Sequence, residues 1–168
     1  MKIAIVYATK TGTTAQAAGQ LADALMSRGF EIALYDLART RPDLAAADAV
    51  ALGGSVRMGQ WRRRAKRFAR AHEAELLQKP LALFLCRMDT DDPRVLLKAQ
   101  AGEKLTEHAV YAGCLGGMMD LEKLKGFDRF IMKMVQKSEE SKGMTAAPGI
   151  SQEGVNACAD ALQGALSP

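Results

Sequence analysis

The hydrophobic positions of the chain fall into two alternating patterns. Short continuous apolar runs, such as the one after Lys2, indicate buried strands, whereas apolar spacings of three and four residues, as between Leu21 and Leu25, indicate amphipathic helices. The predicted strands span residues 2–8, 30–35, 49–53, 81–86 and 109–115. The predicted helices span residues 14–28, 61–77, 93–107 and 152–166. Gly29 is a stop signal for the first helix, and Ser151 is a candidate cap for the last.

Strands that alternate with helices predict an α/β fold with a parallel sheet covered on both faces. Right-handed crossovers between the strands then give a three-layer sandwich, which we expect to form one domain over residues 1–168. In such sheets the ligand binds outside the carboxyl ends of the strands, where the strand order reverses. We therefore expect the chemistry in the loops after the first, third and fourth strands.

Residues 116–149 are more than a minimal five-strand plan needs. Apolar side chains recur there at helical spacing, at Leu121, Leu124, Phe127, Ile131 and Met134. This spacing predicts an inserted amphipathic helix near the fifth strand. One interpretation is that the insert, which leaves the sheet at the ligand edge, determines what reacts there or contacts a membrane. The alternative is that its apolar stripe only packs on the domain.

Composition excludes several classes of protein. The chain has 168 residues, a formal net charge of +4 and no apolar run of about 18 residues that would cross a membrane. Its first residues lack the pattern of a signal peptide, so we expect a cytoplasmic protein. Three cysteines without a C-x-x-C pair predict no disulfide framework, and with only two histidines we expect no transition-metal site.

Positive charge is concentrated in one block of the sequence. The block contains seven cations and no acid, namely Arg57, Arg62, Arg63, Arg64, Lys66, Arg67 and Arg70. Such a block suggests an anionic partner, either a nucleic acid, a membrane surface or an acidic substrate. Nucleic acid is the least favoured of these, because only Trp61 and Phe68 are interleaved as aromatics for base stacking. The alternative is a solvated helix face.

The loop after the first strand has the chemistry of a phosphate site. It reads Thr9, Lys10, Thr11, Gly12, Thr13 and Thr14 and leads directly into a helix. A helix N-terminus offers N–H groups and the positive end of a dipole, and the glycine lets the backbone approach an anion closely. Neither a P-loop nor a G-x-G-x-x-G pattern is present, so we expect one phosphate rather than a dinucleotide. The alternative is an ordinary capped turn.

The pattern T-x-T-G-x-T between a first strand and a first helix resembles the FMN phosphate loop of the flavodoxin family. The resemblance implies FMN as the cofactor and a flavodoxin-like sheet of five parallel strands in the order 2-1-3-4-5. Response regulators share this strand order, but they need an acidic cluster after the first strand and an aspartate after the third. This chain has Ala-Thr-Lys and Gly-Gly-Ser at those places, which excludes that family.

The resemblance also places the flavin ring between the loops after the third and fourth strands. It implies that the ring is lined by Ser55, Val56, Arg57, Met58 and Gly59 and by Cys86, Arg87 and Met88. Met58 and Trp61 are candidates to flank the ring, with a core position as the alternative for Trp61. Arg87 either places positive charge near the ring or forms a surface ion pair with Asp89 or Asp91.

Two further motifs resemble the menaquinone-dependent protoporphyrinogen dehydrogenase group. Residues 53–59 match its G-x-S-[IV]-R-x-G loop, and residues 126–133, GFDRFIMK, are similar to a D-R-F motif in its insert. The resemblance implies an FMN-dependent oxidoreductase that oxidises protoporphyrinogen IX with a quinone as acceptor. The basic residues and the amphipathic insert are compatible with peripheral contact to the inner face of the cell membrane. The alternative is an electron carrier that docks to redox proteins. No catalytic side chain is assigned, because a flavin supplies the chemistry itself.

Overall fold

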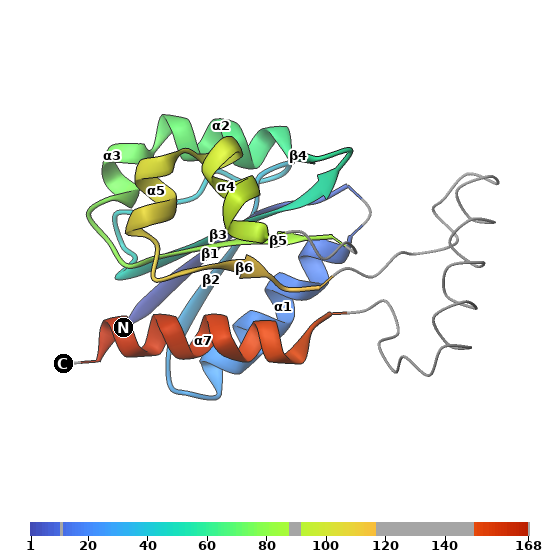
Figure 1. Ribbon diagram of the computed structural model, residues 1–168. Coiled ribbons are helices and arrows are strands. Elements are labelled where there is room, and N and C mark those ends of the chain that lie inside the picture. The colour runs from blue at the N-terminus through green and yellow to red at the C-terminus, as the bar shows by residue number, and fades with distance from the viewer. Residues whose placement is uncertain (11, 88–91, 117–149, 168) are drawn as a thin grey trace, which may run out of the picture.

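A parallel sheet forms the centre of the protein (Figure 1). The computed structural model describes residues 1–10, 12–87, 92–116 and 150–167. The long strands are β1 (Lys2–Ala8), β2 (Glu31–Asp36), β3 (Ala49–Arg57), β5 (Leu81–Cys86) and β6 (Tyr111–Cys114). They lie in the order β2-β1-β3-β5-β6, and every neighbouring pair is parallel. This confirms the predicted order 2-1-3-4-5, because the remaining short strand β4 (Gln60–Trp61) pairs only with the end of β3.

Helices cover both faces of the sheet (Figure 1). One face carries α1 (Thr13–Met26) and α7 (Gln152–Leu166). The other face carries α2 (Arg63–Ala71), α3 (Glu73–Leu76), α4 (Pro93–Ala101) and α5 (Glu103–His108). The three-layer flavodoxin-like sandwich expected from the alternation of strands and helices is therefore confirmed.

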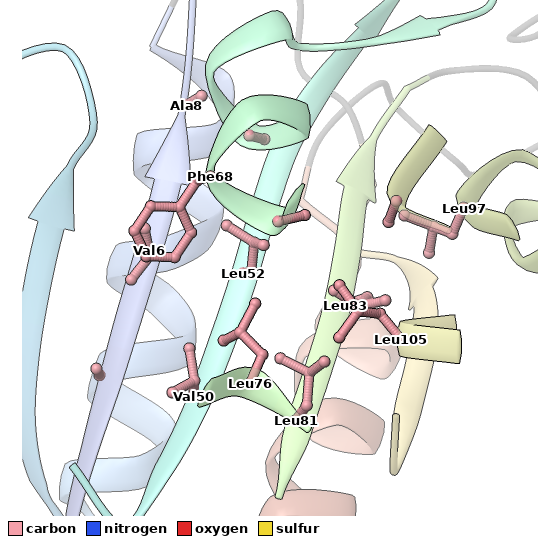
Figure 2. Packing of buried hydrophobic residues seen from close by; sticks show 14 of the residues in the cluster. Val6, Ala8, Val50, Leu52, Phe68, Leu76, Leu81, Leu83, Leu97 and Leu105 are labelled. Carbon is pink, nitrogen blue, oxygen red and sulfur yellow. The ribbon is translucent and has the colours of Figure 1, made fainter. Parts of the chain in front are cut away.

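Alternate residues of each strand serve the two layers, because successive side chains of a strand point to opposite faces. Ile3 and Ile5 of β1 pack beneath α1 and α7, whereas Val6 of the same strand packs on the opposite side. Figure 2 shows this second layer, with Phe68 of α2 and Leu76 of α3 directed toward the sheet. Complete burial of such a side chain contributes roughly 1.5–3 kcal/mol. The sheet thus positions its loops on a rigid, doubly covered platform.

The helix predicted over residues 61–77 begins later and is interrupted. Trp61 belongs to β4, and α2 begins at Arg63. His72 leaves the helical conformation, with φ −114° and ψ 17°, and separates α2 from α3. Its ring lies against Phe68 with centroids 4.2 Å apart. The prediction was wrong at these points because the helical spacing of apolar residues continues without a break from the hairpin to α3. The hairpin and the bend at His72 both keep these apolar residues on the core side.

The other boundaries differ less. The helix predicted over 93–107 is divided at Gly102, whose φ of 105° ends α4. β3 continues to Arg57, beyond the predicted end at residue 53, because its last residues pair with β4. The predicted inserted helix falls within residues 117–149, outside the described residues. Within the described ranges, every helix is too short or too polar to cross a membrane.

Burial isolates two thiols from water. Cys86 of β5 and Cys158 of α7 both lie in the core cluster between the sheet and the α1–α7 layer. Loss of solvent raises the pKa of Cys86 to about 12, although the nearby Thr14 hydroxyl offsets part of the rise. Burial also raises the pKa of Cys158 well above its ordinary value. Both thiols therefore stay protonated in the folded protein under mildly alkaline conditions.

We expect the free energy of unfolding to fall as the pH rises above 9.0, the ordinary thiol pKa. Above that value the unfolded chain ionises both thiols while the folded protein does not, so the unfolded state binds fewer protons and is favoured. Each thiol should lower stability by about 1.4 kcal/mol per pH unit until the pH reaches its folded pKa. Urea titrations at about pH 8 and about pH 10 measure this loss. The C86A/C158A variant should show a smaller loss, and an unchanged loss would contradict the assignment.

Candidate functional site

Three loops meet at one edge of the sheet. Ala8 at the end of β1 is paired with Gly54 of β3, and Ser55 is paired with Cys86 at the end of β5. The loops after β1, β3 and β5 therefore leave the sheet side by side at its carboxyl edge. β1 and β3 are also the strands between which the order of the sheet reverses, which is where α/β folds bind their ligands.

The loop between β1 and α1 is held as an open helix N-terminus. Gly12 adopts a left-handed conformation, with φ 93°, and its N–H donates to Oγ1 of Thr9 at 3.0 Å. The first intrahelical hydrogen bond runs from the N–H of Gln16 to the carbonyl of Gly12 at 3.0 Å. The N–H groups of Thr14 and Ala15 precede that bond, so they have no partner within the helix. No acidic residue lies in the first turn to compete with an incoming anion.

Thr14 places an unsatisfied hydroxyl at this helix end. Its side chain is fully buried, and Oγ1 has no hydrogen-bond partner of ordinary geometry among the described residues. The hydroxyl lies close enough to the Cys86 thiol to affect its pKa, but no well-formed hydrogen bond joins them. A buried polar atom without a partner costs stability unless a ligand supplies one. The residues present therefore fit the phosphate of FMN, the cofactor that the resemblance implies.

The other predicted phosphate residues lie around this end. Thr13 is buried as the first residue of α1, and Lys10 is exposed. Thr9 is half-buried, and its hydroxyl oxygen fixes the turn by accepting from Gly12. Thr11 lies outside the described residues, so its predicted contact with phosphate stays a prediction.

The predicted ring loop, residues 55–59, forms a tight hairpin between β3 and β4. Val56 pairs with Trp61 and Arg57 with Gln60, which leaves Met58 and Gly59 as the two central residues. Both have positive φ, 53° and 73°, as a type I′ turn requires. Such turns favour Asn-Gly, and Met58 is instead an apolar side chain that is 92% exposed. The turn itself therefore does not favour a methionine at this position. An exposed apolar side chain here is suited to contact with a flat ligand.

The remaining ring residues divide between core and edge. Cys86 is only 4% exposed and its side chain lies in the core, so any contact it makes with a ring would be through its backbone. Arg87 is half-buried, and its carbonyl accepts a weak hydrogen bond from the Cys114 thiol at 3.6 Å. Trp61 is 1% exposed, which confirms the core alternative for it. Met88 and the two acids proposed to pair with Arg87 lie outside the described residues.

One feature of the site was missed by sequence reasoning. A cleft of about 460 Å³ lies between the β3–β4 hairpin and α2, and it includes Ser55 and Arg57 of the ring loop. The charge block predicted the cations but not the cleft, because the cleft depends on the β3–β4 hairpin. The sequence pattern predicted residues 55–59 of that hairpin as a loop and assigned Trp61 to a helix. The cleft shares Ser55 and Arg57 with the predicted ring loop and therefore lies directly beside it.

The match to a family model decides the classification. The model described as a flavodoxin domain matches residues 4–146, which include most of β1, the phosphate loop and the ring loop. The chain belongs to the flavodoxin family. This confirms the family predicted from the T-x-T-G-x-T loop, and it agrees with the observed strand order of the sheet.

One protein that is similar in sequence and two that are similar in structure can be compared with this flavodoxin-family protein. Protoporphyrinogen IX dehydrogenase [quinone] of Escherichia coli (strain K12) is 23% identical over 144 residues, covering 82% of this chain and 80% of the relative. The oxidised flavodoxin 1 of Bacillus cereus superposes with a TM-score of 0.58 and 16% identity, over 99% of this chain and all of that one. Rubredoxin oxygen:oxidoreductase from Desulfovibrio gigas gives a TM-score of 0.57 and 15% identity, over 99% of this chain and 37% of the other. The two structures support the fold, and the first relative is of the group that the motifs predicted.

Proposed function

We propose that the protein is an FMN-dependent oxidoreductase that oxidises protoporphyrinogen IX and passes the electrons to a quinone. The observation that supports FMN as the cofactor is the open N-terminus of α1, where the buried hydroxyl of Thr14 has no hydrogen-bond partner among the described residues. The substrate and acceptor are supported by the similarity to protoporphyrinogen IX dehydrogenase [quinone], which extends over 82% of this chain. The two lines of support are independent, because one comes from local geometry and the other from sequence.

The residues of the chain would bind and orient the cofactor. The N–H groups of the first turn of α1 and the Thr14 hydroxyl would hold the phosphate, with Gly12 leaving room for the backbone to approach. The β3–β4 hairpin would lie along the ring, with Met58 at its tip. FMN supplies the redox chemistry when bound, since it accepts electrons from a reduced substrate and returns them to an acceptor. The protein contributes binding, orientation and the charge around the ring.

A second candidate is an electron carrier that docks to redox proteins. Membership of the flavodoxin family and the superposition on B. cereus flavodoxin 1 favour it, because that structure covers nearly the whole chain. The two candidates differ in what reduces the flavin. A carrier takes electrons from a protein surface, whereas the oxidoreductase takes them from a small substrate.

The test is anaerobic reduction of the purified holoprotein by protoporphyrinogen IX. We expect the flavin absorbance to bleach and then to return on addition of a menaquinone analogue, with turnover on the order of one per second or faster. Formation of fluorescent protoporphyrin measures the rate, and free FMN at the same concentration is the control for uncatalysed oxidation. If the flavin is reduced only by a reductase protein and never by the porphyrinogen, the carrier candidate replaces the oxidoreductase.

A further inference from the structure

The cleft beside the predicted ring loop is strongly cationic. Six positive side chains line it, namely Arg57, Arg62, Arg63, Lys66, Arg67 and Arg70. All but Arg57 come from α2 and the residue before it, where spacings of three and four residues place them on one side of the helix. The opposite side of α2 is buried in the core through Ala65, Phe68 and Ala69. The helix therefore presents its charge to the cleft because its apolar side faces the sheet.

These charges have no acidic partner in the part of the chain that the structure describes. The ion pairs there join other residues, and the nearest one in sequence is between His72 and Glu75. Lys66 donates only to the neutral amide of Gln60, at 3.1 Å. Six cations around a space of about 460 Å³ repel one another, so the cleft favours an anion strongly.

The shape of the cleft indicates a discrete ligand. Its walls come from two elements, the hairpin with Arg57 and Gln60 and the helix with Arg63 and Arg67, so a ligand would be contacted from two sides. A bilayer surface would meet the exposed ends of these side chains, whereas a ligand that enters the hollow can contact both walls at once. Guanidinium groups also bind carboxylates in a planar, two-point geometry, which suits several carboxylates carried on one rigid ligand.

We propose that this cleft binds the carboxylate groups of a small polycarboxylate ligand and so orients it toward the predicted ring loop. The identity of the ligand rests on the proposed function, in which the polycarboxylate is the dicarboxylic substrate protoporphyrinogen IX. Ser55 and Arg57 belong both to the cleft and to the predicted ring loop, so a ligand anchored by its acidic groups in the cleft would reach the ring with its uncharged part. The site thus separates recognition, which uses the acidic groups, from reaction at the cofactor.

The experiment uses the holoprotein and mesoporphyrin IX, a dicarboxylic tetrapyrrole, with its dimethyl ester as the uncharged probe. Trp61 is the only tryptophan of the chain and lines the cleft, so quenching of its fluorescence reports occupancy. The cleft variant is R63Q/R67Q, which leaves the predicted flavin residue Arg57 in place. The matched control is R41Q/R64Q, which removes the same charge from exposed positions outside the cleft. R63K/R67K keeps the charge but not the planar geometry.

We expect the Kd of mesoporphyrin IX to rise about tenfold in R63Q/R67Q and to change less than about twofold in R41Q/R64Q. R63K/R67K should fall between them. The dimethyl ester should bind the unchanged protein weakly and should not distinguish the variants. Equal weakening in the cleft variant and the control would overturn the proposal, because it would show a general effect of net charge. Equal affinity for the acid and its ester would overturn it as well.

Two further measurements distinguish this proposal from membrane binding and from the proposed function. If vesicles of phosphatidylglycerol, but not mesoporphyrin IX, lose binding in R63Q/R67Q, the cleft is a membrane surface and the proposal is overturned. If mesoporphyrin IX binding depends on the cleft arginines while the protein oxidises no porphyrinogen, the cleft assignment stands and the proposed function fails. If porphyrinogen is oxidised with the same KM by R63Q/R67Q and the unchanged protein, the proposed function stands and the cleft assignment fails.

Discussion

Replacing Thr14 with valine is expected to weaken FMN binding by about tenfold to a hundredfold. The change removes the buried hydroxyl that has no partner among the described residues, and a hydrogen bond to a charged phosphate is worth about 1.5–3 kcal/mol. Valine has the same shape, so the helix should be retained. The same substitution should stabilise the apoprotein by about 1 kcal/mol, because it removes a buried polar atom that lacks a hydrogen bond.

Titration of the apoprotein with FMN, followed by flavin fluorescence, measures the affinity, and urea unfolding without FMN measures the stability. T14S is the control, because serine keeps the hydroxyl and should bind FMN nearly as well as threonine. The expected fall in FMN affinity and rise in stability make the result specific, because a general disturbance of α1 would lower both the affinity and the stability. Unchanged FMN affinity in T14V would remove Thr14 from the phosphate site.

Replacing Gly53 with alanine is expected to lower the free energy of unfolding by about 3 kcal/mol. A Cβ at this position would overlap the ring of Phe84, which is fully buried in β5 and paired with Gly53 across the sheet. Phe84 is fully buried, and forcing extra volume into a packed core typically costs about 1–3 kcal/mol. Because the loss arises in the core, urea unfolding of the apoprotein should show it without FMN.

A double-mutant cycle with F84L isolates this contact. The smaller leucine should relieve the overlap, so G53A should cost less in the F84L background, by about 1 kcal/mol or more. G164A in α7 is the control for an alanine placed in open space, since no atom would lie within 4 Å of its Cβ. It should raise stability by about 0.5–1 kcal/mol through helix propensity. If G53A costs the same in the F84L background as in the unchanged protein, the overlap is not the cause.

The parts of the fold that could be predicted are those in which local signals agree. β1 and α7 were predicted at their observed bounds, and the Ser151 hydroxyl does accept from the N–H of Gly154, at 3.0 Å. In these segments apolar periodicity and a capping residue point to one structure. The loop before α1 was also predicted as the entry to a helix, because a glycine and threonines are a local signal. Its binding of phosphate stays a prediction.

The parts that were missed depend on residues distant in sequence or on an atypical turn. Trp61 was assigned to a helix because the type I′ turn before it was not recognised. Such turns favour asparagine at the position that Met58 occupies. Without that turn there is no β4, and without β4 there is no second wall for the basic cleft. The division of cysteines into buried and half-buried ones likewise follows from packing against α1 and α7, which no local pattern specifies.

The packing of α7 against α1 has a consequence for biosynthesis. Arg28, just after α1, donates to Asp160 and Gln163 at 2.6 and 2.9 Å, and α7 covers the face of the sheet that contains Phe84. During translation the central strands emerge long before this helix does. The apolar face of these strands therefore remains partly uncovered until about residue 162 has left the ribosome. A translational pause before α7 should thus yield nascent chains that depend on chaperones, and a nonsense codon there should yield truncated chains with the same dependence. In both cases β1, β3 and β5 and the loop before α1 have already been made.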